Sequence, residues 1–230
     1  MTTATVVHAF AAHVATRPDQ PLITFYDDAT GERAELSRAT LANWVAKTAN
    51  LLIDGVGVTP GQVAAVRLPP HWQTAAVLLG CWAAGLSVDR DGAGSAAVGF
   101  VAEGASAPTA DEVYALALAP FGMPFRDGPP RATSDFIVEV RPYGDRLPAL
   151  ATEPGQRAFV DGPTHTDLIA RAVRVPARVL IDVDEHPDPA VWLVAPLLAG
   201  ASTVLCRHLD AGRLAQRLAI ERAAPLGQES

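Results

Sequence analysis

Gln62-Val-Ala-Ala-Val-Arg-Leu68 is a short apolar run with β-branched residues, which is the pattern of a buried strand. Pro69 and Pro70 end this strand, because proline cannot donate a hydrogen bond to a strand ladder. Over residues 72–84, apolar and small side chains predict a helix that is apolar over most of its circumference. A buried strand followed directly by a buried helix is the start of a crossover unit.

The second strand of that unit follows at once. Gly85 stands where a helix needs a left-handed C-cap, and Leu86-Ser-Val88 has the composition of a strand. A strand, a buried helix and a strand predict a right-handed crossover between parallel strands. We therefore expect an α/β fold, with a largely parallel sheet layered with helices.

Outside this stretch, periodicity and capping residues predict further elements. The predicted helices cover residues 6–17, 38–53 (after the N-cap Ser37), 111–119, 164–174, 189–199 and 210–223. The predicted strands cover residues 21–26, 32–36, 97–101, 136–140, 178–181 and 203–206. We expect one α/β domain over residues 1–224, a possible subdivision near residues 141–163, and a frayed tail over residues 225–230.

Composition excludes several classes of protein. The net charge of −7 would repel a polyphosphate partner, so nucleic acid is not an expected ligand. There is no cationic segment followed by an apolar core at the N-terminus, and no apolar run reaches the ~20 residues of a membrane span. Cys81 and Cys206 lie in apolar segments, as reduced core cysteines do. A cytoplasmic location is expected.

Several segments occur in an order that is typical of one superfamily. They are Arg17-Pro-Asp19, Pro21-Leu-Ile-Thr24, Leu36-Ser-Arg-Ala-Thr-Leu41, Ala49-Asn-Leu-Leu52, Pro60-Gly-Gln-Val63, Leu68-Pro-Pro-His-Trp72, Cys81-Trp-Ala-Ala-Gly85 and Ala195-Pro-Leu-Leu-Ala-Gly-Ala-Ser-Thr-Val-Leu205. In this order they resemble the N-terminal part of the adenylate-forming superfamily, which includes acyl-CoA synthetases, peptide-synthetase adenylation domains and luciferases. The chain is most similar to a group of short actinobacterial relatives that keep only this part.

The resemblance implies a place where ATP would bind. Members of the superfamily hold the triphosphate in a loop rich in serine, threonine and glycine that ends in a lysine. Thr164-His165 resembles the Thr-His that follows this loop, so the equivalent segment here is residues 151–165. That segment contains neither serine nor lysine, and its acids Glu153 and Asp161 would repel phosphate. The segment is therefore expected not to bind ATP.

Two other features are poor substitutes for the family's nucleotide-binding groups. Tyr143-Gly-Asp145 is superficially similar to the adenine- and ribose-binding motifs, but it precedes the lost loop, which favours a surface turn. The family's catalytic lysine belongs to a C-terminal domain beyond the extent of the resemblance. Lys47, the only lysine, lies on an early predicted helix and is expected to face away from residues 151–165. The resemblance thus implies a catalytically inactive pseudoenzyme.

Two motifs unrelated to the resemblance are candidate active sites. Asp182-Val-Asp184-Glu185-His186 follows a predicted strand, where a metal-dependent phosphohydrolase would place its acids. The threonine and lysine of that chemistry are missing, so a solvated acidic loop is favoured. Gly92-Ala-Gly94-Ser-Ala-Ala97 formally matches a dinucleotide-binding motif, but the next residues look extended where such a motif needs a helix.

The remaining reactive residues form no recognisable constellation. The histidines lack zinc-type spacing, and no Gly-x-Ser-x-Gly elbow is present. The sequence therefore predicts no catalytic, cofactor-binding or metal-binding residue, and no cofactor. The first hypothesis is a binding protein whose partner is another protein or a small apolar ligand. The alternatives are a half-enzyme completed by a partner chain for acyl adenylation, and a phosphohydrolase at Asp182 and Asp184.

Overall fold

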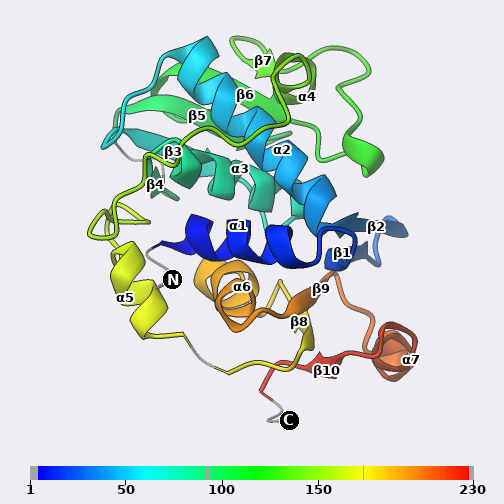
Figure 1. The fold of residues 1–230 in the computed structure, drawn as a ribbon. Helices are drawn as coiled ribbons and strands as arrows, with labels where there is room; N and C mark the ends of the chain where they lie inside the picture. The colour runs from blue at the N-terminus through cyan, green and yellow to red at the C-terminus, as the bar shows by residue number, and fades with distance from the viewer. Residues whose placement is uncertain (1–4, 92–93, 173, 228–230) are drawn as a thin grey trace.

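The computed structural model describes residues 5–91, 94–172 and 174–227. Two five-stranded sheets lie one above the other, with helices between them (Figure 1). Sheet A has the order β10-β8-β9-β1-β2 and consists of β1 (Pro21–Asp27), β2 (Glu32–Ser37), β8 (Arg178–Asp182), β9 (Ser202–Arg207) and β10 (Ala224–Pro225). Sheet B has the order β4-β3-β5-β6-β7 and consists of β3 (Val63–Arg67), β4 (Ser87–Asp89), β5 (Ala96–Ala102), β6 (Ala110–Leu116) and β7 (Ser134–Asp135).

Neighbouring strands are parallel throughout both sheets except in the β1–β2 hairpin. The α/β class and the largely parallel pairing predicted from the sequence are therefore confirmed, although the strands are divided between two sheets. Sheet A joins strands from both ends of the chain, since β1 pairs with β9 and Phe25 lies opposite Leu205. Residues 141–163 carry the chain from sheet B towards sheet A (Figure 1).

The helices begin where the sequence supplies a capping side chain. Thr5, Ser37 and Asp210 each accept a backbone N–H of the turn that follows. The α-helices are α1 (Val6–Thr16), α2 (Arg38–Asn50), α3 (Trp72–Ala83), α4 (Phe136–Val140), α5 (His165–Ala170), α6 (Ala195–Ala199) and α7 (Ala211–Glu221). Leu51–Val56 and Ala190–Val194 form π-helical turns, and Pro120–Gly122 forms a 3₁₀ turn.

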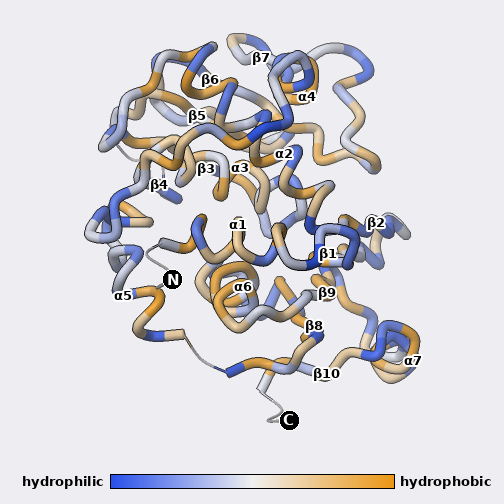
Figure 2. The backbone as a smooth tube through the Cα atoms, in the orientation of Figure 1, coloured by the Kyte–Doolittle hydropathy of each residue, from blue (hydrophilic) through white to orange (hydrophobic). Residues whose placement is uncertain are grey.

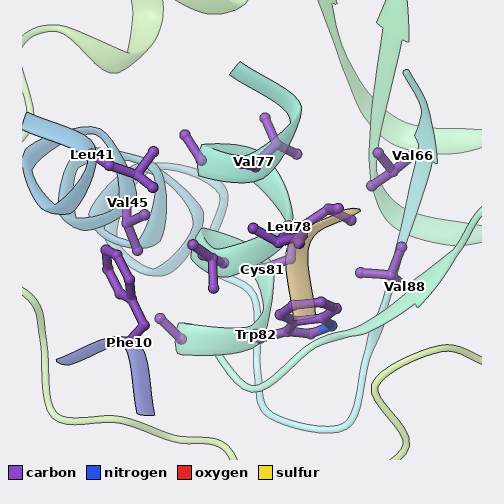
Figure 3. Close-up of a cluster of buried hydrophobic side chains, with 14 of the residues drawn as sticks. Phe10, Leu41, Val45, Val66, Val77, Leu78, Cys81, Trp82 and Val88 are labelled. Carbon is purple, nitrogen blue, oxygen red and sulfur yellow. The ribbon is translucent and has the colours of Figure 1, made fainter. Parts of the chain in front are cut away.

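Helix α3 is the centre of the core, and all of its residues are buried. Figure 3 shows Phe10, Leu41 and Val45 on one side of α3, with Val66 and Val88 of sheet B on the other. A helix enclosed in this way has no solvent-facing side, so it needs apolar residues around its whole circumference. The flanking strands β3 and β4 pair in parallel, as the sequence predicted.

Two predicted elements are wrong. Residues 111–119 were expected to form a helix, but Ala110–Leu116 form β6, which pairs along its whole length with β5. Residues 136–140 were expected to form a strand, but they form α4. Asp135 caps α4 by accepting the N–H groups of Ile137 and Val138, and this local hydrogen bonding outweighs the β-propensity of the β-branched residues.

Two boundaries also differ from expectation. Helix α5 ends at Ala170, well short of the expected residue 174. Pro225, which was expected to begin a frayed tail, pairs with Leu180 in sheet A. Helix α7 packs on the outer side of sheet A and mixes hydrophilic and hydrophobic residues, as a surface helix does (Figure 2). Within the described residues, no helix is long and apolar enough to span a membrane.

Candidate functional site

Residues 157–160 extend sheet B beyond β4. Phe159 pairs in parallel with Val88, whose N–H donates to the Ala158 carbonyl at 3.0 Å. Val160 donates back to the Val88 carbonyl at 2.9 Å, and the indole Nε1 of Trp82 donates to Ala158 O at 2.9 Å. Residues 157–160, which lie within the segment that the resemblance equates with the phosphate loop, are thus fixed to both α3 and β4.

The turn that follows is closed by its own backbone. The N–H groups of Ala158, Gly162 and His165 donate to Pro163 O, Phe159 O and Gln156 O at 3.1, 2.9 and 3.0 Å. A phosphate cradle needs several N–H groups that point together at the ligand. Here these N–H groups already have acceptors within the protein, so opening a cradle would require breaking them.

The Thr-His pair after this turn also has a structural role. Thr164 and Asp167 form a reciprocal capping box, with Thr164 Oγ1 accepting from Asp167 N and Asp167 Oδ2 accepting from Thr164 N, both at 3.1 Å. The Thr164 hydroxyl group also donates to Asp167 Oδ2 at 2.8 Å, and this bond, together with the one from Thr164 N, lowers the pKa of Asp167. The helix N-terminus therefore already holds a carboxylate of its own.

His165 is completely buried beneath this turn. Its ring meets the ring of Trp82 edge to face, with 5.7 Å between the centroids. Burial lowers the pKa of His165 to about 4, so the imidazole is neutral near pH 7. Neither ring nitrogen has a hydrogen-bond partner within the described residues. The side chain packs in the core and does not face a ligand site.

Lys47 lies away from residues 151–165, on α2. Its Nζ donates to the carbonyls of Arg141 and Tyr143 at 3.0 and 2.6 Å, and lies 2.7 Å from Asp145 Oδ1. Lys47 therefore fixes the turn after α4, which is the Tyr143-Gly-Asp145 turn. In this position the ammonium group holds backbone carbonyls, and it is not available to a triphosphate.

The acidic loop after β8 is organised by its own hydrogen bonds. Asp182 Oδ1 accepts from Asp184 N at 3.0 Å, and Asp184 Oδ2 accepts from His208 N at 2.5 Å. No group of three His, Cys, Asp or Glu residues suited to a metal ion occurs in the described parts of the chain. These contacts are those of a structured turn, and they add no support to the phosphohydrolase hypothesis.

The remaining candidates from the sequence have ordinary surroundings. Gly92 of the glycine-rich motif lies outside the described residues, but the motif leads into strand β5 and not into a helix. Cys81 and Cys206 are both buried and unpaired as free thiols, and burial raises the pKa of Cys206 to about 11. Neither thiol has the lowered pKa that marks a reactive cysteine.

A cleft that the sequence did not reveal lies where strands of both sheets end. It consists of two adjoining cavities of about 800 and 720 Å³, which share Pro69, Ala102 and Arg207. These three residues lie at or just beyond the carboxyl ends of β3, β5 and β9. The carboxyl edge of a parallel sheet is the place where α/β proteins bind ligands. This cleft is lined by none of residues 151–165.

The larger cavity contains two buried polar side chains that come from different sheets. Glu32 begins β2, and its side chain is 7 % exposed; His71 precedes α3, and its side chain is 2 % exposed. Glu32 Oε1 and His71 Nε2 lie 3.8 Å apart, which is too far for a hydrogen bond. Neither atom has another partner within the described residues.

Comparison with known proteins identifies the chain's relatives. No model of a known protein family matches the sequence. A TIGR03089 family protein of Mycobacterium tuberculosis is 39% identical over 222 residues, which cover 89% of this chain and 90% of that protein. The chain belongs to the TIGR03089 family.

Solved structures show which fold this TIGR03089 protein shares. An acyl-CoA synthetase of Brucella canis matches 96% of the chain with a TM-score of 0.70 and 18% identity, and the N-terminal domain of FACL13 from Mycobacterium tuberculosis matches 97% with a TM-score of 0.67 and 13% identity. The chain covers 46% of the first structure and 62% of the second. It thus spans about half the length of the synthetase. The resemblance to the N-terminal part of adenylate-forming enzymes is confirmed at the level of the fold.

The sequence of this chain gives only a weak indication of the residues that line the cleft. His71 stands between two prolines and a buried helix, and this position marks it as an N-cap at the end of a strand. Glu32 gave no signal, because its burial arises from the way sheet A meets the β3–α3 connection. Glu32 and His71 are distant in the chain, and they become neighbours only through the packing of the two sheets.

Proposed function

We propose that this TIGR03089 protein does not form acyl adenylates and acts instead by binding, with the cleft at the carboxyl ends of the strands as its ligand site. The closure of residues 151–165 carries the proposal. The N–H groups of Ala158, Gly162 and His165 donate to protein carbonyls, and Glu153 and Asp161 add negative charge on the exposed side. Arg157 is the segment's one cation, and its guanidinium group already donates to Gly162 O at 2.8 Å, so the acids leave the segment with a net negative charge that repels a triphosphate.

The cleft supports the second half of the proposal. Its larger cavity of about 800 Å³ is within the size range of small-molecule sites, and its lining includes the apolar residues Phe25, Pro69 and Leu118. Asp27, Arg33, Glu103 and Arg207 add charged groups, so a small ligand with both an apolar and a polar part suits this lining. The walls come from both sheets, so a bound ligand would hold the two sheets together and stabilise the folded state.

Calorimetric titration with MgATP tests the first half of the proposal. The expected result is no binding heat at millimolar nucleotide, with an acyl-CoA synthetase as the positive control. A micromolar Kd would contradict the proposal. A thermal-shift screen of small metabolites tests the second half, because a ligand that binds only the native state raises the Tm.

A second candidate function is that of a half-enzyme completed by a partner chain. It is favoured by the exposed side chains of Phe121 and Met123, which are 81 % and 54 % exposed and lie beside the cleft. Large apolar side chains at a surface are frequent at interfaces. Co-purification from the native host followed by an acyl-adenylate assay separates the two functions: product formed only in a complex supports the half-enzyme.

A further inference from the structure

Arg207 is a cation of the cleft whose charge is not used within the protein. It ends β9, is half-buried, and borders both cavities. Its guanidinium group makes no hydrogen bond or ion pair within the described residues. Asp27, its neighbour on β1, accepts from Ala29 N at 2.9 Å and lies 2.8 Å from His208 Nδ1 instead. Arginine side chains that are shielded from water are normally paired, so Arg207 is available to an anionic group of a ligand.

The smaller cavity has an excess of positive charge. Its described lining contains three arginines and one acid, namely Arg67, Arg90, Arg207 and Asp91. Arg90 Nη1 lies 2.9 Å from Asp188 Oδ1, and Asp188 is not part of the lining. Arg207 therefore adds its unused charge to a wall that is already cationic. An anionic group is favoured on this side of the cleft.

The larger cavity has the opposite excess. The charged side chains in its described lining are Asp27, Glu32, Glu103, Arg33 and Arg207. Arg33 Nη2 is 2.9 Å from Glu35 and 3.2 Å from Glu221, and neither of these acids lines the cavity. The exposed carboxylate of Glu103 has no hydrogen bond or ion pair in the part of the chain that the structure describes. A cationic group is favoured on this side.

The two cavities adjoin at an apolar place. Besides Arg207, they share Pro69 and Ala102, whose small side chains suit a hydrocarbon chain. We propose that the cleft binds an extended zwitterion, whose anionic group pairs with Arg207 on the side of the smaller cavity and whose cationic group pairs with Glu103 in the larger one. An α-amino acid carries its two charges too close together to reach both cavities. This inference rests on the proposed binding function and names the class of ligand.

ω-Amino acids with chains of four to eight carbons are suitable probes, because their charges lie at opposite ends. Each is compared with the alkanoate, the alkylamine and the 2-amino acid of the same chain length. Binding is followed by NMR, through the indole N–H of Trp192 in the smaller cavity and the backbone amide of Glu103 in the larger one.

One ω-amino acid should shift both signals and bind at least about 10-fold more tightly than its three comparison compounds, which is the value of one charge-assisted hydrogen bond. The 2-amino acid is the sharpest comparison, because it has the same atoms and differs only in where the ammonium group is attached. If no ω-amino acid binds more tightly than its comparison compounds, the inference is overturned.

Variants at the two ends test the assignment of the charges. Arg207→Gln should weaken the binding of that ω-amino acid at least about 10-fold and leave the alkylamine unaffected, whereas Arg207→Lys should retain most of the affinity. Glu103→Gln should weaken the ω-amino acid and leave the alkanoate unaffected. Arg213→Gln and Glu185→Gln remove the same charges at exposed positions outside both linings, and should bind as the unmodified protein does. Unchanged affinity in Arg207→Gln or in Glu103→Gln would overturn the inference.

The same samples distinguish this inference from the proposed function. If no ω-amino acid is preferred and MgATP also fails to bind, the zwitterion site is wrong and the non-adenylating function stands. If MgATP binds with micromolar affinity, the proposed function is wrong. Preferred binding of one ω-amino acid that is lost in Arg207→Gln, without binding of MgATP, supports both.

Discussion

In residues 151–165 the N–H groups of Ala158, Gly162 and His165 all donate to carbonyls of the same segment. At the carboxyl edge of the sheets, by contrast, Glu32 Oε1 and His71 Nε2 lie buried 3.8 Å apart without a partner in the described structure. Buried polar groups are normally hydrogen-bonded, because leaving one unpaired costs about 1–3 kcal/mol. Both ring nitrogens of His165 also lack a partner among the described residues, so the two regions do not differ in unpaired buried side chains. They differ in backbone hydrogen bonding and in open space: residues 151–165 are closed by their own carbonyls, whereas the edge of the sheets borders a cavity of about 800 Å³.

Removing the side chain that anchors residues 151–165 should have the largest effect. Trp82→Ala deletes a fully buried indole that packs on Phe159 and His165, and should lower the free energy of unfolding by about 3–5 kcal/mol. Trp82→Phe loses mainly the bond to Ala158 O and should cost about 1 kcal/mol. Urea denaturation measures both. Equal losses would show that the hydrogen bond, and not packing, holds the segment.

Acid should destabilise the closed segment through His165. Its pKa is 6.5 in a model peptide and about 4 in the folded protein, so between these values the unfolded chain binds more protons. Stability is therefore fully present above pH 6.5 and should fall by about 3 kcal/mol as the pH drops to 4. His165→Leu should flatten this part of the pH profile. The same slope in both proteins would contradict the assignment.

Replacing the unpaired carboxylate in the cleft should stabilise the protein. Glu32→Met removes a buried charge without a hydrogen-bond partner, and should raise the free energy of unfolding by about 1–3 kcal/mol. Glu35→Met on the same strand is the control. It loses the contacts with Thr24 and Arg33, and should slightly lower stability. Destabilisation by Glu32→Met would mean that Glu32 already has a structural partner.

The smallest effect is expected at Lys47. Lys47→Met removes two hydrogen bonds to the turn after α4 and a partly exposed ion pair with Asp145, and should cost at most about 1 kcal/mol. It should leave the thermal shifts produced by cleft ligands unchanged. A loss of ligand binding would give Lys47 a role that its contacts do not indicate.

The sequence predicted correctly those helices and strands whose residue pattern is compatible with only one type of secondary structure. The apolar helix at α3, the strands beside it and the Ser37, Thr164 and Asp210 caps are local signals, and each is present in the structure. Asp111 as a possible N-cap favours a helix over residues 111–119, but pairing with β5 decides the outcome. In residues 136–140, the cap at Asp135 was the overlooked signal.

The candidate site was only partly predictable. The lack of serine and lysine in residues 151–165 can be read directly from the sequence, and it leads to the proposed loss of nucleotide binding. The cleft could not be read in this way, because Glu32 and His71 become neighbours only when two sheets meet. The burial of a polar side chain by distant strands depends on tertiary packing, so no periodicity or motif in the sequence indicates it.

Amide hydrogen exchange of residues 156–165, measured by NMR with and without MgATP, tests the central claim most directly. The account predicts slow exchange of the Ala158, Gly162 and His165 amides, because each N–H has an acceptor, and no change in shift or protection when MgATP is added. Fast exchange of these amides that becomes slow on addition of MgATP would show a nucleotide cradle, and would contradict the account.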